Sequence, residues 1–238
     1  MGLVALEGVR PSVPIAVISA ESNKYQAIKL VELIHTFLPK QQFNIIIPDK
    51  NIANQPDIVH RDYEVFGGIM KGRSGIIIIG SKENEAVEKN IIECAYNFNF
   101  PILCLGESFK YLAEVLGLSV CTKKRDEHKD EVHIIWDDNS ILNGYGGRDF
   151  KLRTLGFNLL SLSEVDKKQD IFVEGVLKED NFNYEYAEFF SVSNKHFCVG
   201  LNYSPELEGN YELLEGVVFS FVSICRRVVI CVCPDEDE

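Results

Sequence analysis

Two short segments of this chain hold the residue types needed for nucleophilic chemistry. They are Pro101–Leu118 (PILCLGESFKYLAEVLGL) and Phe197–Glu206 (FCVGLNYSPE). A hydrolase can be built from a thiol or hydroxyl nucleophile and a neighbouring base when the two lie within roughly 2.6–3.2 Å of each other. The side chains available for these roles are Cys104, Glu107, Ser108, Ser204 and Glu206.

Each candidate also has an ordinary structural interpretation. Cys104 lies in an apolar run, where a free thiol usually acts as a small core hydrophobe. Ser204 carries a hydroxyl, which cannot serve as a general base near neutral pH. The histidines, at positions 35, 60, 128, 133 and 196, are the other possible bases. Among them His196 precedes the strand expected to end at Ser204, which predicts a place at the far end from the other candidates.

Strands and helices alternate through the first half of the chain. Short apolar runs predict strands at Pro14–Ala20, Phe43–Ile47, Gly75–Ile79 and Ile102–Leu105. Apolar residues at helical spacing predict helices from Ala27 to Leu38 and from Val87 to Ala95, and a further helix after Leu105 that reaches about Leu116, with Gly117 as its C-terminal stop. This alternation favours a mainly parallel sheet with helices on both faces.

The second half has weaker signals. The charge-dense stretch Cys121–Glu131 predicts a solvated loop, and Val132–Trp136 predicts a strand. Short apolar runs broken by polar residues predict strands or hairpins over Thr154–Phe190. At the end we expect a packed helix at Leu213–Val222, a strand or more helix at Arg226–Cys233, and a disordered acidic tail at Pro234–Glu238.

Composition limits the classes of partner. With 238 residues and 46% hydrophobic content, residues 1–238 fit a single domain. The net charge of −12 argues against nucleic acid and anionic membrane surfaces as partners. The absence of an 18-residue apolar run, of a signal peptide and of a myristoylation motif indicates a cytoplasmic protein with reduced cysteines. We expect no metal, because Cys231-x-Cys233 has no matching pair, and no cofactor, because no phosphate-binding loop is present.

The two segments resemble the catalytic motifs of class I glutamine amidotransferases. In that family the first motif reads Pro-hydrophobic-Leu-Gly-Ile-Cys-x-Gly-x-Gln, and its Cys is the nucleophile; in this chain that position is Gly106. The second reads Val-Gly-hydrophobic-Gln-hydrophobic-His-Pro-Glu, and the position of its catalytic His is Ser204. The resemblance implies a three-layer, flavodoxin-like α/β sandwich that lacks both the nucleophile and the base. Glu206 stands at the position of the Glu that orients the His.

Within this family the chain is most similar to the glutaminase domain of CTP synthase. The likeness extends over Ile15–Leu38, Ser74–Glu83 and Ile91–Pro101, and with the two motifs it covers about two thirds of the sequence. The ATP-using synthetase domain of CTP synthase is absent. On the oxyanion side the family's Pro-Gly-Gly-Phe-Gly corresponds to residues 79–83, so that Gly80 is kept and Ser81 replaces the second Gly.

The replacements at Gly106 and Ser204 imply a loss of glutaminase activity. In a coupled triad, loss of the nucleophile alone costs about as much as loss of all three members, on the order of 10⁶ in turnover. Our hypothesis is therefore an inactive amidotransferase-like domain that binds a protein partner or a small metabolite. Its predicted pocket comprises Gly80, Ser81, Glu107, Ser108 and Ser204. The alternative is a hydrolase with a rebuilt centre, whose nucleophile is Cys104 or Ser108. The oligomeric state is not predicted.

Overall fold

The computed structural model of the protein describes residues 13–48, 68–122, 130–134, 149–152, 158–177, 186–202 and 211–232. A central sheet follows the order β2-β1-β3-β4-β11-β10-β9-β6-β7, with β8 paired to β10 and β5 to β8. The parallel strands are β1 (Ile15–Ser19), β2 (Phe43–Ile46), β3 (Ile76–Gly80), β4 (Ile102–Gly106) and β11 (Cys198–Leu201). The antiparallel ones are β5 (Cys121–Thr122), β6 (Asp130–Ile134), β7 (Asp149–Leu152), β8 (Asn158–Ser161), β9 (Ile171–Leu177) and β10 (Tyr186–Val192).

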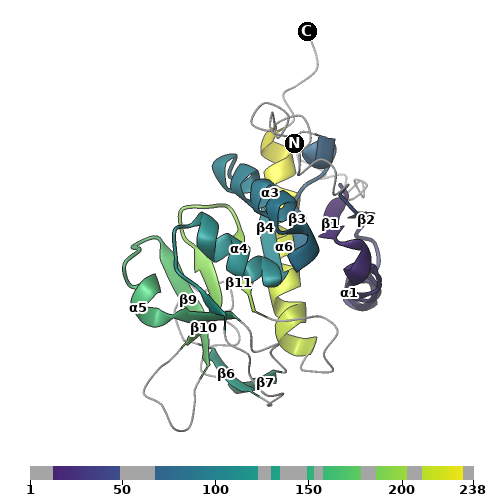
Figure 1. Cartoon of the computed structure of the whole chain (residues 1–238). Helices are drawn as coiled ribbons and strands as arrows, with labels where there is room; N and C mark the ends of the chain where they lie inside the picture. Colours follow the sequence, from purple (N-terminus) through teal and green to yellow (C-terminus); the bar gives the residue numbers. More distant parts are fainter. Residues whose placement is uncertain are drawn as a thin grey trace, which may run out of the picture.

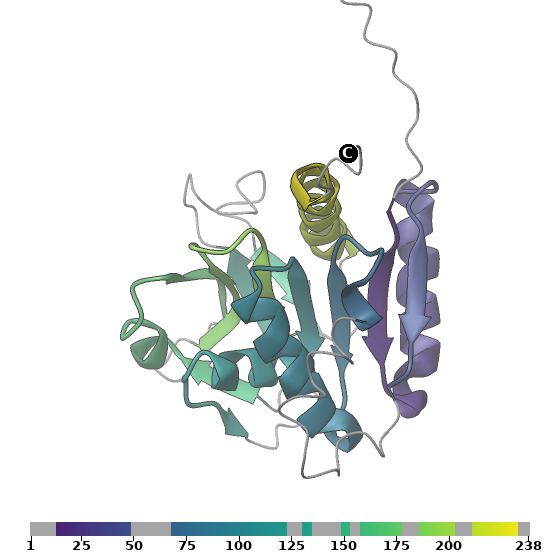
Figure 2. The same cartoon turned by 90° about the horizontal axis from the view of Figure 1, so that it is seen from above.

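Helices cover both faces of this sheet (Figures 1 and 2). The α-helices are α1 (Lys24–Phe37), α3 (Glu85–Asn97), α4 (Glu107–Val115), α5 (Leu162–Val165) and α6 (Tyr211–Val232), and short 3₁₀ turns precede α1 (η1, Glu21–Asn23) and α3 (η3, Lys82–Asn84). Apolar residues of α1 and α6 pack on one face, and those of α3 and α4 on the other. The molecule is therefore a three-layer α/β sandwich, as predicted.

The isoleucine run of β3 shows how the sequence specifies two cores. Side chains alternate along a strand, so Ile77 and Ile79 join the core under α1 and α6, while Ile76 and Ile78 join the core under α3 and α4. All four are at most 2% exposed. A continuous β-branched run is typical of a parallel strand covered on both sides, and this run predicts β3 correctly.

Most predicted elements of the first half agree with the structure to within a few residues. The strands β1, β2, β3 and β4 and the helices α1, α3 and α4 are all present where apolar periodicity predicts them. Gly117, the predicted stop, has a φ of 75° after the end of α4. Left-handed backbone of this kind commonly ends a helix at glycine.

The second half differs from the predictions in three places. Cys121 and Thr122, predicted in a loop, form β5 and pair with β8. A short helix, α5, interrupts the stretch 154–190, for which only strands or hairpins are predicted. Asp130 and Glu131 belong to β6 rather than to a loop, because their pairing with Leu152 and Lys151 of β7 outweighs their polar character. The end of the chain continues as helix to Val232, which resolves the open alternative at 226–233. The predicted tail, 234–238, lies outside the described residues.

Candidate functional site

The turn from β4 to α4 is made by Gly106, the last residue of the strand and the one before the helix. Its backbone has φ 65° and ψ −123°, which a residue with a β-carbon adopts only with strain. Gly106 lies at the carboxyl edge of the sheet, in register with Gly80 of β3. The position that the resemblance gives to the nucleophile is thus a sharp strand-to-helix bend without a side chain.

Gly80 allows β3 to approach the first turn of α4. A β-carbon built on Gly80 would lie 1.9 Å from the backbone nitrogen of Ser108, far inside van der Waals contact. The Ser108 hydroxyl lies within hydrogen-bonding distance of the carbonyl oxygens of Ile78 and Leu105, at 2.9 Å from each. Ser108 is fully buried, so its side chain ties α4 to β3 and β4.

Cys104 lies two residues before the bend, inside β4. Its side chain is fully buried and packs in the core under α3 and α4. Burial raises the pKa of this thiol well above its ordinary value, and the neighbouring Cys198 raises it further. A thiol in this state carries almost no thiolate near neutral pH and is therefore a poor nucleophile.

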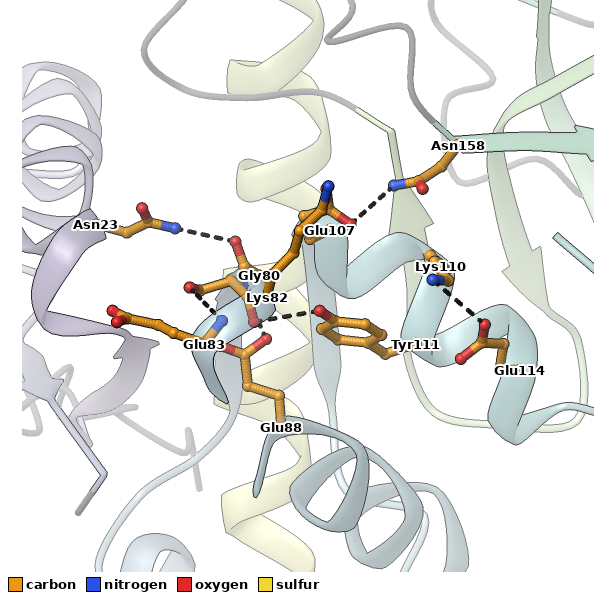
Figure 3. Close-up of polar contacts among 11 residues, drawn as sticks. Asn23, Gly80, Lys82, Glu83, Glu88, Glu107, Lys110, Tyr111, Glu114 and Asn158 are labelled. Atoms are coloured by element: carbon orange, nitrogen blue, oxygen red, sulfur yellow. Dashed lines mark hydrogen bonds and ion pairs between the residues drawn. The ribbon is translucent and has the colours of Figure 1, made fainter. Parts of the chain in front are cut away.

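The loop after β3 is fixed through the peptide groups of Ser81. Its backbone N–H donates to Oε2 of Glu88 over 3.1 Å, and its carbonyl oxygen accepts from the hydroxyl of Tyr111 over 3.2 Å (Figure 3). The Ser81 hydroxyl accepts from the backbone N–H of Glu83 over 3.3 Å. This predicted pocket residue therefore uses its amide and its carbonyl inside the protein.

Glu88, which holds that amide, is a buried acid. Its side chain comes from the first turns of α3 and is fully buried. Desolvation raises the pKa of its carboxyl group to about 8; the hydrogen bond from the Ser81 N–H opposes this shift, and the negative charges of Glu107, Glu83 and Glu85 add to it. The neutral form is accordingly favoured near neutral pH.

Glu107 is the first residue of α4 and follows the bend directly. Its carboxylate lies 3.6 Å from Nζ of Lys82 and accepts a hydrogen bond from Nδ2 of Asn158 over 3.3 Å (Figure 3). The Glu107 side chain is 13% exposed, whereas that of Lys82 is 69% exposed. Glu107 is thus more deeply buried than Lys82, and its hydrogen bond to Asn158 connects the bend to β8.

Hydrogen bonds also join the loops that follow β1 and β3. Nδ2 of Asn23 donates to the carbonyl oxygen of Gly80 over 2.9 Å, and the Ser22 hydroxyl donates to Oε1 of Glu83 over 2.6 Å. The chain passes from β1 to β2 on one side and to β3 on the other, so this is the point where the strand order reverses. In open α/β sheets, ligands bind outside the carboxyl ends of strands at such points.

The second motif is described as far as Asn202. Residues 199–201 lie in β11, where Leu201 is in register with Leu105 of β4. Nδ2 of Asn202 donates to Oε2 of Glu188 over 2.8 Å and to the carbonyl oxygen of Asn158 over 2.9 Å. The predicted site residues Ser204 and Glu206 lie outside the described residues.

Two of the histidines lie away from the bend. The backbone N–H of His196 donates to Asn99 over 2.8 Å, beside the amino end of β11, which is the end opposite to Gly106. His35, on α1, has Nε2 at 2.9 Å from the carbonyl oxygen of Gln41. His60 and His128 lie outside the described residues.

Sequence reasoning missed Asn23, Glu88 and Asn158. A signal for Glu88 exists, because it lies on the stripe of α3 that also contains the buried Ile91, Ile92 and Ala95. A charged residue on an apolar stripe marks a specific buried partner. Asn23 and Asn158 carry no such signal, since asparagine is common in loops and at strand ends.

The described ranges contain no group of three or more His, Cys, Asp or Glu side chains that could hold a metal ion. Within the same ranges, no helix has the length and apolar character needed to cross a membrane.

Comparison with known proteins places the fold. No family model and no curated protein matches the sequence. Among solved structures, the chain is similar to the glutaminase domain of Trypanosoma brucei CTP synthase with bound acivicin, with a TM-score of 0.69, 13% identity and coverage of 91% of this chain and 94% of that one. It is also similar to a glutamine amidotransferase from Thermotoga maritima, with a TM-score of 0.54, 15% identity and coverage of 92% and 97%.

At such low sequence identity the comparisons support only the fold. They agree with an α/β fold whose central sheet is largely parallel and is covered by helices. The chain therefore has the α/β fold of the class I glutamine amidotransferases.

Proposed function

We propose that this chain is a catalytically inactive domain with the amidotransferase fold, and that it binds a protein partner or a small metabolite beside Gly106. The observation that carries this proposal is the bend itself. Its φ of 65° and ψ of −123° form a strained strand-to-helix turn of the kind that presents a nucleophile, but glycine has no side chain to present. Losing the nucleophile of a coupled triad costs on the order of 10⁶ in turnover.

The surroundings of the bend favour binding over catalysis. Ser81 and Ser108, two of the predicted pocket residues, direct their polar groups inward and support the backbone. Glu107 is partly exposed and is linked to Lys82 and Asn158, so it gives the site a charged group of fixed position. The described cysteines are all free, which fits the proposed cytoplasmic location.

A hydrolase with a rebuilt centre is the rival function, and two observations weigh against it. Cys104 is fully buried with a raised pKa, and it lies in the core rather than at the bend. Ser108 is fully buried, and its hydroxyl lies 2.9 Å from each of two backbone carbonyl oxygens. A nucleophile must instead face its substrate and an adjacent base.

Glutaminase assays test this proposal directly. The purified protein is incubated with glutamine while ammonia is measured, and in parallel with a glutamine-like electrophile while adducts are followed by intact mass. We expect no ammonia above the buffer rate and no adduct on native Cys104 or Ser108. The variant Gly106→Cys is the control, since it places a thiol at the bend for the electrophile to reach. Turnover in the ordinary glutaminase range, or an adduct at Cys104 or Ser108, would overturn the proposal.

A further inference from the structure

Two polar residues are buried at the start of α3: Asn84, which is the N-cap of the helix, and Glu88, which lies within it. Asn84 and Glu88 are four positions apart, which places them on one side of the helix start, and they are 3% and 0% exposed. Oε1 of Glu88 and both amide atoms of Asn84 are buried without a hydrogen-bond partner. A buried carboxylate with a single partner is costly, whereas the neutral acid is tolerated.

Glu88 holds a peptide group that connects three elements. Its Oε2 accepts from the N–H of Ser81, directly after β3, while Tyr111 of α4 donates to the carbonyl oxygen of the same residue (Figure 3). On the other side, Gly80 is packed against the backbone of Ser108. The Ser81 peptide is therefore held between α3 and α4, next to the bend.

The groups that face Glu88 are acidic or neutral. They are Glu83 of η3, Glu85 of α3, Glu107 and Tyr111 of α4, and Cys104 of β4. The nearby lysines have other partners: Lys89 pairs with Glu85 at 2.6 Å and with Glu114 at 2.7 Å, and Lys82 lies 3.6 Å from Glu107. Ionised Glu88 would thus add a negative charge to a region that already repels it.

We propose that Glu88 is a proton-dependent latch: the neutral carboxyl group stays buried against the Ser81 peptide next to the bend, and loss of its proton favours a state in which the carboxylate reaches solvent and the loop of residues 81–84 is released. The latch regulates the same site as the proposed binding function and rests on that function for its effect on a ligand. The latch itself is a property of the ligand-free protein.

The direction of the pH effect follows from the two states. In the closed state the pKa of Glu88 is about 8, and in the released, solvated state it returns toward its ordinary value of 4.5. Opening therefore releases a proton between these two values. The opening equilibrium rises about tenfold per pH unit from roughly pH 5 to pH 8 and levels off outside that window.

Amide hydrogen exchange at Ser81, measured by NMR on the ligand-free protein, tests the latch. The protection factor divides out the intrinsic pH dependence of exchange, so it reports the opening alone. We expect the protection factor of Ser81 to fall about tenfold per pH unit between pH 5 and pH 8. The amide of Ile78, inside β3, exchanges only through global unfolding, so its protection factor should stay above that of Ser81 at every pH.

Two variants separate the proton from the hydrogen bonds. Glu88→Gln keeps the shape and an acceptor for the Ser81 N–H, so the protection factor should become independent of pH. Tyr111→Phe removes the bond to the Ser81 carbonyl oxygen, so protection should drop at every pH with an unchanged slope. A constant protection factor at Ser81 in the wild-type protein, or an unchanged slope in Glu88→Gln, would overturn the latch.

The titration of the Glu88 carboxyl carbon in the wild-type protein gives an answer that needs no variant. A midpoint near pH 8 supports the latch, and one near 4.5 overturns it. Because these measurements use no ligand, the latch can fail while the binding function stands. Likewise, the binding function can fail while the latch stands.

Discussion

At the scale of single residues, the site is defined by what glycine permits. Gly106 occupies a backbone conformation that places any β-carbon under strain, and it does so at the position that the motif resemblance gives to the nucleophile. In an active enzyme such strain is tolerated because the side chain acts in catalysis. Here glycine adopts the conformation without that strain, so the bend can form without any catalytic role.

Gly106→Ala tests this interpretation. The substitution introduces a β-carbon at φ 65° and ψ −123°, so we expect a loss of about 1–3 kcal/mol in the free energy of unfolding. Denaturant unfolding measures this loss. Gly68→Ala is the matched control, because its β-carbon meets nothing within 4 Å and its φ is not in the strained range. Equal stability of the two variants would show that the bend does not have the positive φ described.

At the scale of elements, the site depends on the contact between β3 and α4. Gly80 permits this contact, and the Ser108 hydroxyl, at 2.9 Å from the carbonyl oxygens of Ile78 and Leu105, secures it. These interactions hold the carboxyl ends of β3 and β4 at one level, with Gly80 in register with Gly106. The position of the bend is therefore a consequence of packing between strand and helix.

Gly80→Ala is the corresponding test. The new β-carbon would lie 1.9 Å from the Ser108 nitrogen and 2.5 Å from the carbonyl carbon of Glu107, and backbone atoms cannot move aside without displacing α4. We expect destabilisation at the upper end of the ~1–3 kcal/mol typical of overpacking, or above it.

Gly200→Ala provides the graded comparison for this prediction. Its β-carbon would meet ring atoms of Phe190 at 2.9 Å, and a side chain can yield more easily than backbone. Thermal unfolding of both variants should rank Gly80→Ala as the less stable. The reverse order would contradict the close approach of β3 to α4.

Local patterns predict the elements well where both faces of the sheet are covered. Along Ile76–Ile79 the side chains alternate between the two cores, as in a strand, whereas the buried residues of α3 recur at helical spacing. Because the two periods differ, each pattern fits only one type of element. The short helix α5 was not predicted, because it spans only four residues. The strand β6 was predicted, but its first residues, Asp130 and Glu131, were assigned to a loop, because their strand pairing depends on the distant β7. Sequence spacing carries little information about either.

The candidate site was predictable from the sequence only in part. Motif register alone assigns Gly106 to the nucleophile position, and the structure places it at the bend. The partners that complete the site come from three other elements: Asn23 before α1, Glu88 on α3 and Asn158 on β8. Their contacts depend on how the layers pack, which no local pattern records. Ser204 and Glu206 remain predictions.

At the scale of the whole molecule, the balance of charge determines how stability responds to pH. The chain carries 36 acidic and 24 basic residues, so many carboxylates titrate together in acid. A carboxylate changes the pH dependence of stability only when its pKa differs between the folded and unfolded states. Glu88 is such a group, because burial raises its pKa in the folded state to about 8.

Comparing Glu88→Gln with the wild-type protein isolates this one group from the rest of the charge. The folded wild type holds a proton at Glu88 that the unfolded chain loses near pH 4.5, so its stability is full below that pH and falls as pH rises toward 8. The variant has no such loss, so its advantage in unfolding free energy should grow by up to ~1.4 kcal/mol per pH unit across this window and then stop growing. Glu85→Gln serves as the control, because the hydrogen bond from Lys89 lowers the pKa of Glu85, and its difference from wild type should be flat between pH 5 and pH 8. Parallel wild-type and Glu88→Gln curves in urea unfolding over that range would mean that Glu88 binds its proton equally in both states, and hence that it is not buried in the folded protein.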